Sequence, residues 1–175
     1  MKINYVIATY NSKGKRFHSH PPPEYVLKCH LLNIITYHSI LSQITIMCAE
    51  SDNYYENYYD LDDIITKSNI PIKIIKCENY AISMGQWLKA YELFKDEFDY
   101  YIFIEDDYCP GMKNFDQILI DCYKNKFSDG LGFLCSTVCR DGAHHYPIHF
   151  EGVVLLNNQT LEKLYKEPKW NGDPR

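Results

Sequence analysis

Strand-like and helix-like segments alternate along the chain, and this alternation constrains the fold more than any other feature. Short β-branched and aromatic runs are separated by segments whose apolar residues have helical spacing. We expect strands at residues 3–9, 44–49, 72–77, 100–104, 131–136 and 150–156, and helices at residues 25–41, 61–67, 86–95, 113–126 and 160–166. Strands joined through helices of this length pair in parallel. The sequence therefore predicts an α/β fold with a mostly parallel central sheet flanked by helices.

Size and composition narrow the classes of protein further. The 175 residues suit one domain, because a single core usually serves roughly 100–200 residues. A net charge of −5 argues against a nucleic-acid partner, which would favour a basic face. The sequence has neither an apolar run of membrane-spanning length nor a signal-peptide pattern, so we expect no membrane span and a cytoplasmic protein. The cysteines are odd in number and scattered, which predicts reduced thiols.

Three consecutive acids follow the most apolar strand. Glu105, Asp106 and Asp107 come directly after residues 100–104, and ligands of parallel sheets bind beyond the carboxyl ends of the strands. Side chains alternate along an extended chain, so we expect Glu105 and Asp107 on one side and Asp106 on the other. Two carboxylates on one side suit Mg²⁺ or Mn²⁺. The alternative is a solvated acidic loop, or a cap for the helix that follows.

This strand with its Glu-Asp-Asp end resembles the D-x-D motif of nucleotide-sugar-dependent glycosyltransferases with the GT-A fold. Residues 6–11 are similar to the first strand of that family, and residues 150–154 with the following helix are similar to its acceptor-side strand and helix. The resemblance implies a single GT-A-like (Rossmann-like) domain. Residues 1–107 would be its nucleotide-sugar-binding half and residues 108–175 a short acceptor half. That shortness leaves open a minimal enzyme or one piece of a longer protein.

The resemblance also implies roles for particular side chains. Asp107, helped by Glu105, would coordinate the metal, and an acid near the acceptor, Asp173 or Glu151, would be the catalytic base. The nucleotide sugar would be bound by Thr9, Tyr10, Asn11, Glu50, Asp52, Asn79, Glu105 and Asp106. The sequence departs from the family at Gln86-Trp87, a neighbourhood in which many relatives carry an arginine.

The function implied is a metal-dependent glycosyltransferase of hexosyl or N-acetylhexosaminyl type. It would use Mn²⁺ or Mg²⁺ and a UDP- or GDP-linked donor, and would transfer the sugar with inversion to a glycan or protein acceptor. Two other classes stay open. A metal-dependent nucleotidyltransferase would use the same acids on a nucleoside triphosphate, and a non-catalytic domain of a larger protein would only bind nucleotide or glycan. The sequence contains no P-loop, no dinucleotide fingerprint and no nucleophile elbow.

Three further groups of residues have both a structural and a functional interpretation. His144, His145 and His149 could supply a metal ligand or form an exposed loop. Trp87 and Tyr91, one helical turn apart, favour core packing over a sugar platform. The basic residues from 13 to 16 could meet a diphosphate or remain solvated.

Overall fold

The computed structural model describes residues 1–13, 23–56, 60–79, 82–139 and 149–166. These residues form six strands: β1 (Ile3–Asn11), β2 (Gln43–Glu50), β3 (Ile72–Cys77), β4 (Tyr100–Glu105), β5 (Phe133–Cys139) and β6 (His149–Asn157). The helices of the same ranges are α1 (Pro23–Tyr37), α2 (Asp62–Ile65), α3 (Ile82–Phe94), α4 (Phe115–Lys126) and α5 (Asn158–Lys166). Every expected element is therefore present, and only the boundaries differ.

All the strands belong to one mostly parallel sheet. Their order is β3-β2-β1-β4-β6-β5, with β1 parallel to both β2 and β4, and β2 parallel to β3. β6 runs antiparallel to both of its neighbours, β4 and β5. This confirms the predicted fold class. Because β6 pairs with β4, the segments on either side of residue 107 share one sheet.

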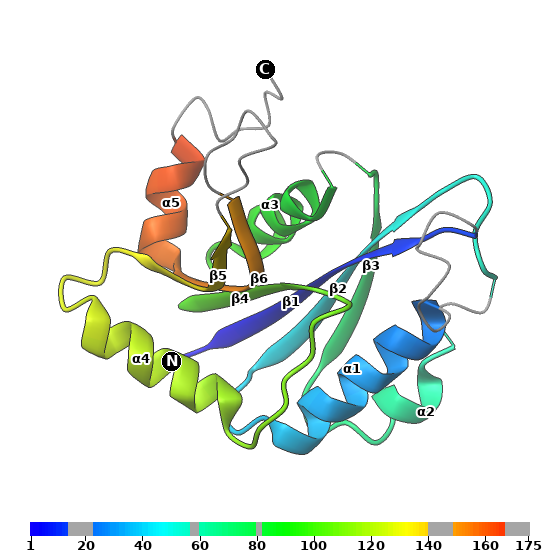
Figure 1. Cartoon of the computed structure of the whole chain (residues 1–175), viewed down its shortest axis with the longest axis horizontal. Coiled ribbons are helices and arrows are strands. Elements are labelled where there is room, and N and C mark those ends of the chain that lie inside the picture. The colour runs from blue at the N-terminus through cyan, green and yellow to red at the C-terminus, as the bar shows by residue number, and fades with distance from the viewer. Residues whose placement is uncertain (14–22, 57–59, 80–81, 140–148, 167–175) are drawn as a thin grey trace.

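Helices cover both faces of the sheet (Figure 1), with α1, α2 and α4 on one face and α3 and α5 on the other. On the first face Leu27, Leu31 and Ile34 of α1 are fully buried, as expected from their spacing along one helical stripe. On the second face the aromatic side chains of α3 pack against β4. None of the helices in the described ranges has both the length and the apolar character needed to cross a bilayer.

α1 ends four residues earlier than the sequence pattern predicts, and Asp116 of α4 explains the difference. The carboxylate of Asp116 is fully buried and accepts hydrogen bonds from the backbone N–H groups of Ser39, Ile40 and Leu41 at 2.6–3.0 Å. It also accepts one from the Ser39 hydroxyl at 2.9 Å. Because these N–H groups donate to the carboxylate, they do not donate to the backbone carbonyl groups one helical turn earlier. A contact across about 75 positions of sequence therefore ends the helix.

α3 begins at Ile82, four residues before the predicted start. Gly85 therefore lies inside the helix, where a glycine costs about 1 kcal/mol relative to alanine. The packing of Trp87, Ala90 and Tyr91 against the sheet stabilises the helix despite that glycine. The same packing confirms that Trp87 and Tyr91 are core residues.

Strand order reverses between β1 and β4, which defines the topological switch point of the sheet. β2 and β3 extend from one side of β1, and β4, β6 and β5 extend from the other. The carboxyl ends of β1 and β4 lie side by side, with Ala8 paired with Glu105. Side chains that follow these two strand ends occupy the position at which open α/β sheets bind their ligands.

Candidate functional site

The acidic segment lies at this switch point, and its side chains differ sharply in exposure. Asp106 is fully buried, whereas Glu105 is half-buried and Asp107 is exposed. Glu105 is the last residue of β4, and Asp106 and Asp107 lie in the turn that follows, so this turn sets the directions of their side chains. Glu105 and Asp107 are therefore the members of the segment that reach solvent.

Asp106 is bound on three sides by residues distant in sequence. Its backbone N–H donates to the carbonyl oxygen of Ala8 at 3.1 Å. Its carboxylate accepts a hydrogen bond from the hydroxyl of Thr9. Its carbonyl oxygen lies 3.2 Å from Nδ1 of His30 on α1. Asp106 thus fixes the end of β4 to both β1 and α1, and its carboxylate faces the protein interior rather than the surface.

His30 is a buried imidazole on the otherwise apolar face of α1. It is 1 % exposed, and its Nε2 lies 2.9 Å from the hydroxyl of Tyr5 on β1. Burial lowers the pKa of His30 to about 4, although the hydrogen bond to the Asp106 carbonyl opposes that change. The ring is neutral at physiological pH. Sequence reasoning missed His30. The available signal was a histidine next to Leu31 in a helix whose neighbouring core position is Leu27, and that signal does not identify the partners of the ring.

The end of β1 is held by Gln86 of α3. The amide oxygen of Gln86 accepts from the backbone N–H of Thr9 at 2.9 Å, and its amide nitrogen donates to the Thr9 carbonyl at 3.2 Å. The neighbouring Trp87 donates its indole N–H to the carbonyl of Ile104 at 3.2 Å. Gln86 and Trp87 therefore fix the ends of β1 and β4.

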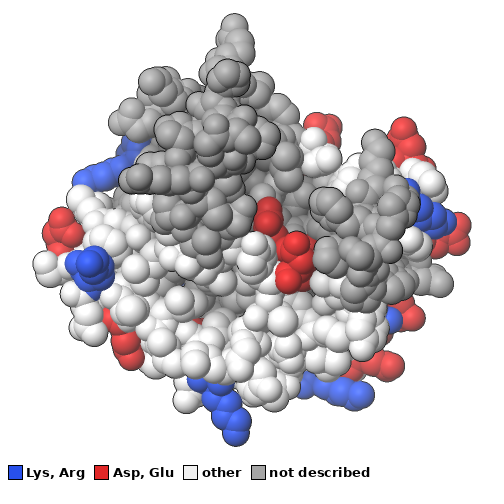
Figure 2. Space-filling model, in the orientation of Figure 1, with Lys and Arg blue, Asp and Glu red and all other residues white. Residues whose placement is uncertain are grey.

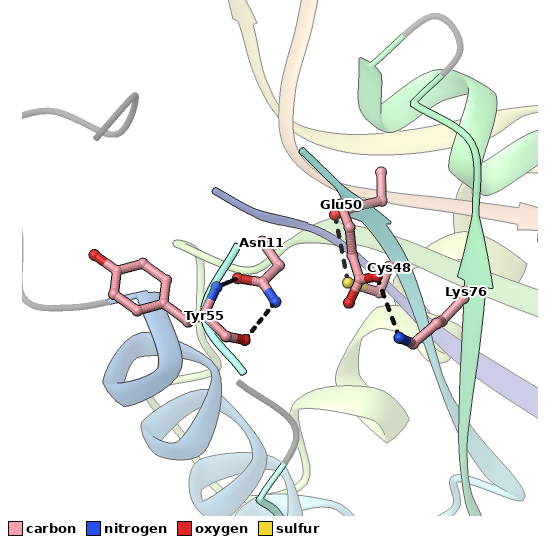
Figure 3. Close-up of polar contacts among 6 residues, drawn as sticks. Asn11, Cys48, Glu50, Tyr55 and Lys76 are labelled. Atoms are coloured by element: carbon pink, nitrogen blue, oxygen red, sulfur yellow. Dashed lines mark hydrogen bonds and ion pairs between the residues drawn. The ribbon is translucent and has the colours of Figure 1, made fainter. Parts of the chain in front are cut away.

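Asn11, the last residue of β1, is buried and tied to the segment after β2. Its amide nitrogen donates to the carbonyl of Tyr55 at 3.0 Å, and its amide oxygen accepts from the Tyr55 N–H at 2.9 Å (Figure 3). The ammonium of Lys13 lies 5.5 Å from the centre of the Tyr55 ring. Asn11 thus folds residues 51–55 against the carboxyl end of β1.

Glu50 ends β2, and its carboxylate lies 3.2 Å from the ammonium of Lys76 on β3, as Figure 3 shows. The Lys76 side chain is 68 % exposed and that of Glu50 is 23 % exposed, so water screens the pair and it contributes little to stability. The pair instead places a hydrogen-bond acceptor and a cation side by side at the carboxyl edge.

Some of the other expected site residues lie near the same edge of the sheet, and the structure does not describe the side chains of the rest. Tyr10 is partly buried at the end of β1, and Asp52 and Asn79 are exposed after β2 and β3, so all three lie near the same edge. Glu151 lies on β6, and at this residue the structure describes the backbone but not the side chain. Asp173, like His144, His145 and the basic residues 15 and 16, lies outside the described residues.

Gly152, which belongs to the strand expected on the acceptor side, meets two residues that sequence reasoning missed, Ser136 and Tyr108, beside the acidic segment. Gly152 of β6 has a φ of +78°, a conformation that side-chain-bearing residues rarely adopt. A Cβ atom at Gly152 would lie 2.1 Å from Oγ of Ser136 and 3.5 Å from the ring of Tyr108. A glycine inside a strand pattern often marks such a close approach. The backbone of β6 therefore comes close to Tyr108, the residue after Asp107.

Glu105 and Asp107 carry oxygen donors of the kind that a hard divalent cation prefers. No group of three or more His, Cys, Asp or Glu side chains in the described ranges could hold a metal unaided. Mg²⁺-type sites usually consist of one or two carboxylates completed by water and substrate phosphates, which is what Glu105 and Asp107 can offer. On the face drawn in Figure 2, a few acidic side chains lie near the centre, and the basic side chains lie toward the outline together with other acidic ones.

No protein-family model and no curated protein sequence matches the chain. Several solved structures share its fold. The 4-diphosphocytidyl-2C-methyl-D-erythritol synthase of Anaerococcus prevotii is 8% identical with a TM-score of 0.63, covering 99% of this chain and 77% of its own. A cytidylyltransferase from Leptospira borgpetersenii is 14% identical with a TM-score of 0.54, covering 94% and 63%. Mouse xyloside xylosyltransferase 1 is 11% identical with a TM-score of 0.53, covering 98% and 73%.

At these identities the similarity establishes the fold alone. The six-stranded sheet of the described residues, with helices on both faces, is a GT-A-like, Rossmann-like nucleotide-binding fold. The polar side chains of this chain gather where that fold binds its ligands.

Proposed function

We propose that the chain is a metal-dependent transferase that acts on a nucleoside-diphosphate sugar and passes the sugar to an acceptor hydroxyl with inversion. The donor would be UDP- or GDP-linked, the sugar a hexosyl or N-acetylhexosaminyl group, and the acceptor a glycan or a protein. One observation carries the proposal. At the switch point of the sheet, Asp106 is turned inward and bound, and Glu105 and Asp107 are left facing solvent.

In this proposal Asp107, with Glu105, holds Mn²⁺ or Mg²⁺ at the edge of the sheet. A cation bound there would supply positive charge against the leaving diphosphate. Glu50 and Asp52 would accept hydrogen bonds from the base, and Thr9, Tyr10, Asn11 and Asn79 would line the base and ribose site. Glu105 and Asp106 would support the ribose and the diphosphate, Asp106 acting through the backbone that it anchors.

The transfer forms one bond and breaks another at the same carbon. The acceptor oxygen bonds to the anomeric carbon, the bond from that carbon to the diphosphate oxygen breaks, and the nucleoside diphosphate leaves. The hydroxyl proton passes to a carboxylate, for which Glu151 and Asp173 are the candidates. Glu151 belongs to β6, which neighbours β4, and in this proposal that strand would face the acceptor.

The second candidate is a metal-dependent nucleotidyltransferase, which would act on a nucleoside triphosphate and release pyrophosphate. The observation that favours it is the TM-score of 0.63 to the Anaerococcus synthase, against 0.53 to the mouse xylosyltransferase. The described carboxyl edge favours the glycosyltransferase. It carries more acids than bases, and one of its cations, Lys76, is paired with Glu50. A triphosphate would need more positive charge than these residues provide.

Product analysis tests the proposal directly. The protein is incubated with UDP- or GDP-linked sugars, or with nucleoside triphosphates and sugar phosphates, each with Mn²⁺ and an acceptor panel. Release of nucleoside diphosphate, reduced at least 100-fold by Asp107→Asn, is the expected result. The matched control is Asp96→Asn, which neutralises an exposed carboxylate in the connection between α3 and β4, at the opposite edge of the sheet.

The other outcomes identify the alternatives. Pyrophosphate as the product would replace the glycosyltransferase by the nucleotidyltransferase. Equal activity in Asp107→Asn and Asp96→Asn would refute the assigned metal ligand. Binding of a nucleotide without turnover would leave a non-catalytic nucleotide-binding domain.

A further inference from the structure

We propose that His30 is a positioning residue for the acidic segment, holding the peptide between Asp106 and Asp107 so that the Asp107 carboxylate is aimed at the metal. The proposal rests on the proposed function, because it concerns how that metal site is built. His30 itself would not touch the metal or the substrate. It would act through one hydrogen bond from its ring to the carbonyl oxygen of Asp106.

The hydrogen-bond partners of the ring determine which nitrogen carries its proton. The Asp106 carbonyl, 3.2 Å from Nδ1, can only accept, so Nδ1 must be the donor. A neutral imidazole then has a bare Nε2, which accepts from the Tyr5 hydroxyl at 2.9 Å. The direction of donation is therefore Tyr5 to His30 to Asp106, through groups that are each at most 1 % exposed.

The contact matters because of where the carbonyl lies. That carbonyl belongs to the peptide bond leading into Asp107, so an anchor on it fixes the rotation of this peptide plane. Among the contacts described, the N–H and the carboxylate of Asp106 hold the chain before that plane, and the N–H of Tyr108 donates to the carbonyl oxygen of Glu105 at 3.3 Å across the turn. Without His30, the plane would lose the hydrogen bond made directly to its carbonyl, and the long Glu105–Tyr108 contact would be left to restrain the turn. Ligating carboxylates need such supporting contacts, and their loss typically costs 10–100-fold in metal affinity.

A matched pair of variants isolates this one contact. Tyr5→Phe removes the hydroxyl but keeps His30 as donor to Asp106. Tyr5→Phe/His30→Leu also removes the donor, and the apolar pair fills similar space. The Tyr5–His30 hydrogen bond is replaced on both sides, whereas the buried Asp106 carbonyl loses its donor, so we expect a folded but less stable protein. Mn²⁺ is titrated in the presence of UDP and, separately, GDP, and free Mn²⁺ is followed by electron paramagnetic resonance. We expect Tyr5→Phe to bind Mn²⁺ within about twofold of the wild type, and the double variant to bind at least tenfold more weakly.

Nitrogen-15 NMR of the wild-type protein supplies a readout that depends on no variant. A protonated Nδ1 and a bare Nε2 on His30 are expected, and a protonated Nε2 would overturn the inference even if the double variant failed to fold. Equal Mn²⁺ affinity in Tyr5→Phe and the double variant would overturn it while leaving the proposed function intact. A wild-type protein that bound neither nucleotide with Mn²⁺ would instead overturn the proposed function, and the inference with it.

Discussion

At the scale of single residues, His30 makes stability depend on pH. Its native pKa of about 4 lies below the ordinary value of 6.5, so between these values the unfolded chain binds a proton that the native chain does not. Stability from this group is complete above pH 6.5 and is lost as the pH falls toward 4. The free energy of unfolding that is lost through His30 amounts to about 3 kcal/mol at pH 4.

The measurement is the free energy of unfolding in urea at several values of pH between 4 and 7. Tyr5→Phe, which keeps the imidazole, should follow the wild type. Tyr5→Phe/His30→Leu should lose less stability on acidification than either, because the group that titrates is gone. Parallel curves for all three proteins would show that His30 does not titrate as its burial requires.

Gly152 is the second residue whose surroundings allow a sharp prediction. Gly152→Ala would place a side chain at a φ of +78° and a Cβ atom 2.1 Å from Ser136 Oγ. We expect a loss of about 2–4 kcal/mol in the free energy of unfolding, from backbone strain and overpacking together. Gly111→Ala is the matched control, since a Cβ there meets nothing within 4 Å. Equal melting temperatures of the two variants would contradict the left-handed backbone of Gly152 and its close approach to Ser136.

At the scale of elements, the capture of residues 39–41 by Asp116 decides where α1 ends and how it meets β2. Asp116→Asn replaces one acceptor oxygen by a donor that faces N–H groups, and leaves buried donors without partners. We expect a loss of about 2–4 kcal/mol on urea unfolding. Asp121→Asn, on the same helix but bonded only to the exposed Gln117 amide among the contacts described, should change it by less than about 0.5 kcal/mol. Similar losses in both variants would remove the explanation for the helix end.

The comparison with sequence reasoning is most instructive at this scale. β3 runs over residues 72–77 in both prediction and structure, because an apolar run bounded by a proline and polar residues defines it locally. The C-terminal end of α1 and the start of α3 could not be predicted. They depend on Asp116 and on the packing of Trp87, which are contacts between distant parts of the chain. Local patterns record propensity, and tertiary contacts override it at the boundaries.

The candidate site also has features that could be predicted from the sequence and features that could not. The position of the acidic segment after a buried strand could be predicted. The burial of Asp106 could not, because it depends on contacts with Thr9 and His30. The contacts of Gln86 and His30 could not be predicted, because each joins two residues that are far apart in the sequence. Gln86 lies 77 positions from its partner and His30 lies 76 positions from its partner. Such contacts depend on how the helices lie against the sheet, which no pattern along the chain specifies.

At the scale of the whole molecule, charge and topology together favour a phosphate-binding site that needs a metal cation. The chain carries a net charge of −5, and Glu50, Glu105 and Asp107 lie at the edge where the fold binds ligands. Such an edge repels a diphosphate unless a cation lies between them. Nucleotide binding should therefore depend on the metal, and at low salt this dependence should be strongest.

Thermal unfolding with UDP and GDP, each with Mn²⁺ or with EDTA, tests this central claim most directly. A nucleotide at 100 times its dissociation constant adds about 2.7 kcal/mol, which should raise the melting temperature by roughly 5–10 °C for a chain of this size. The account predicts that rise for at least one nucleotide with Mn²⁺, its loss in EDTA and in Asp107→Asn, and its retention in Asp96→Asn. A melting temperature that no nucleotide raises with Mn²⁺, or that rises equally in EDTA, would contradict it.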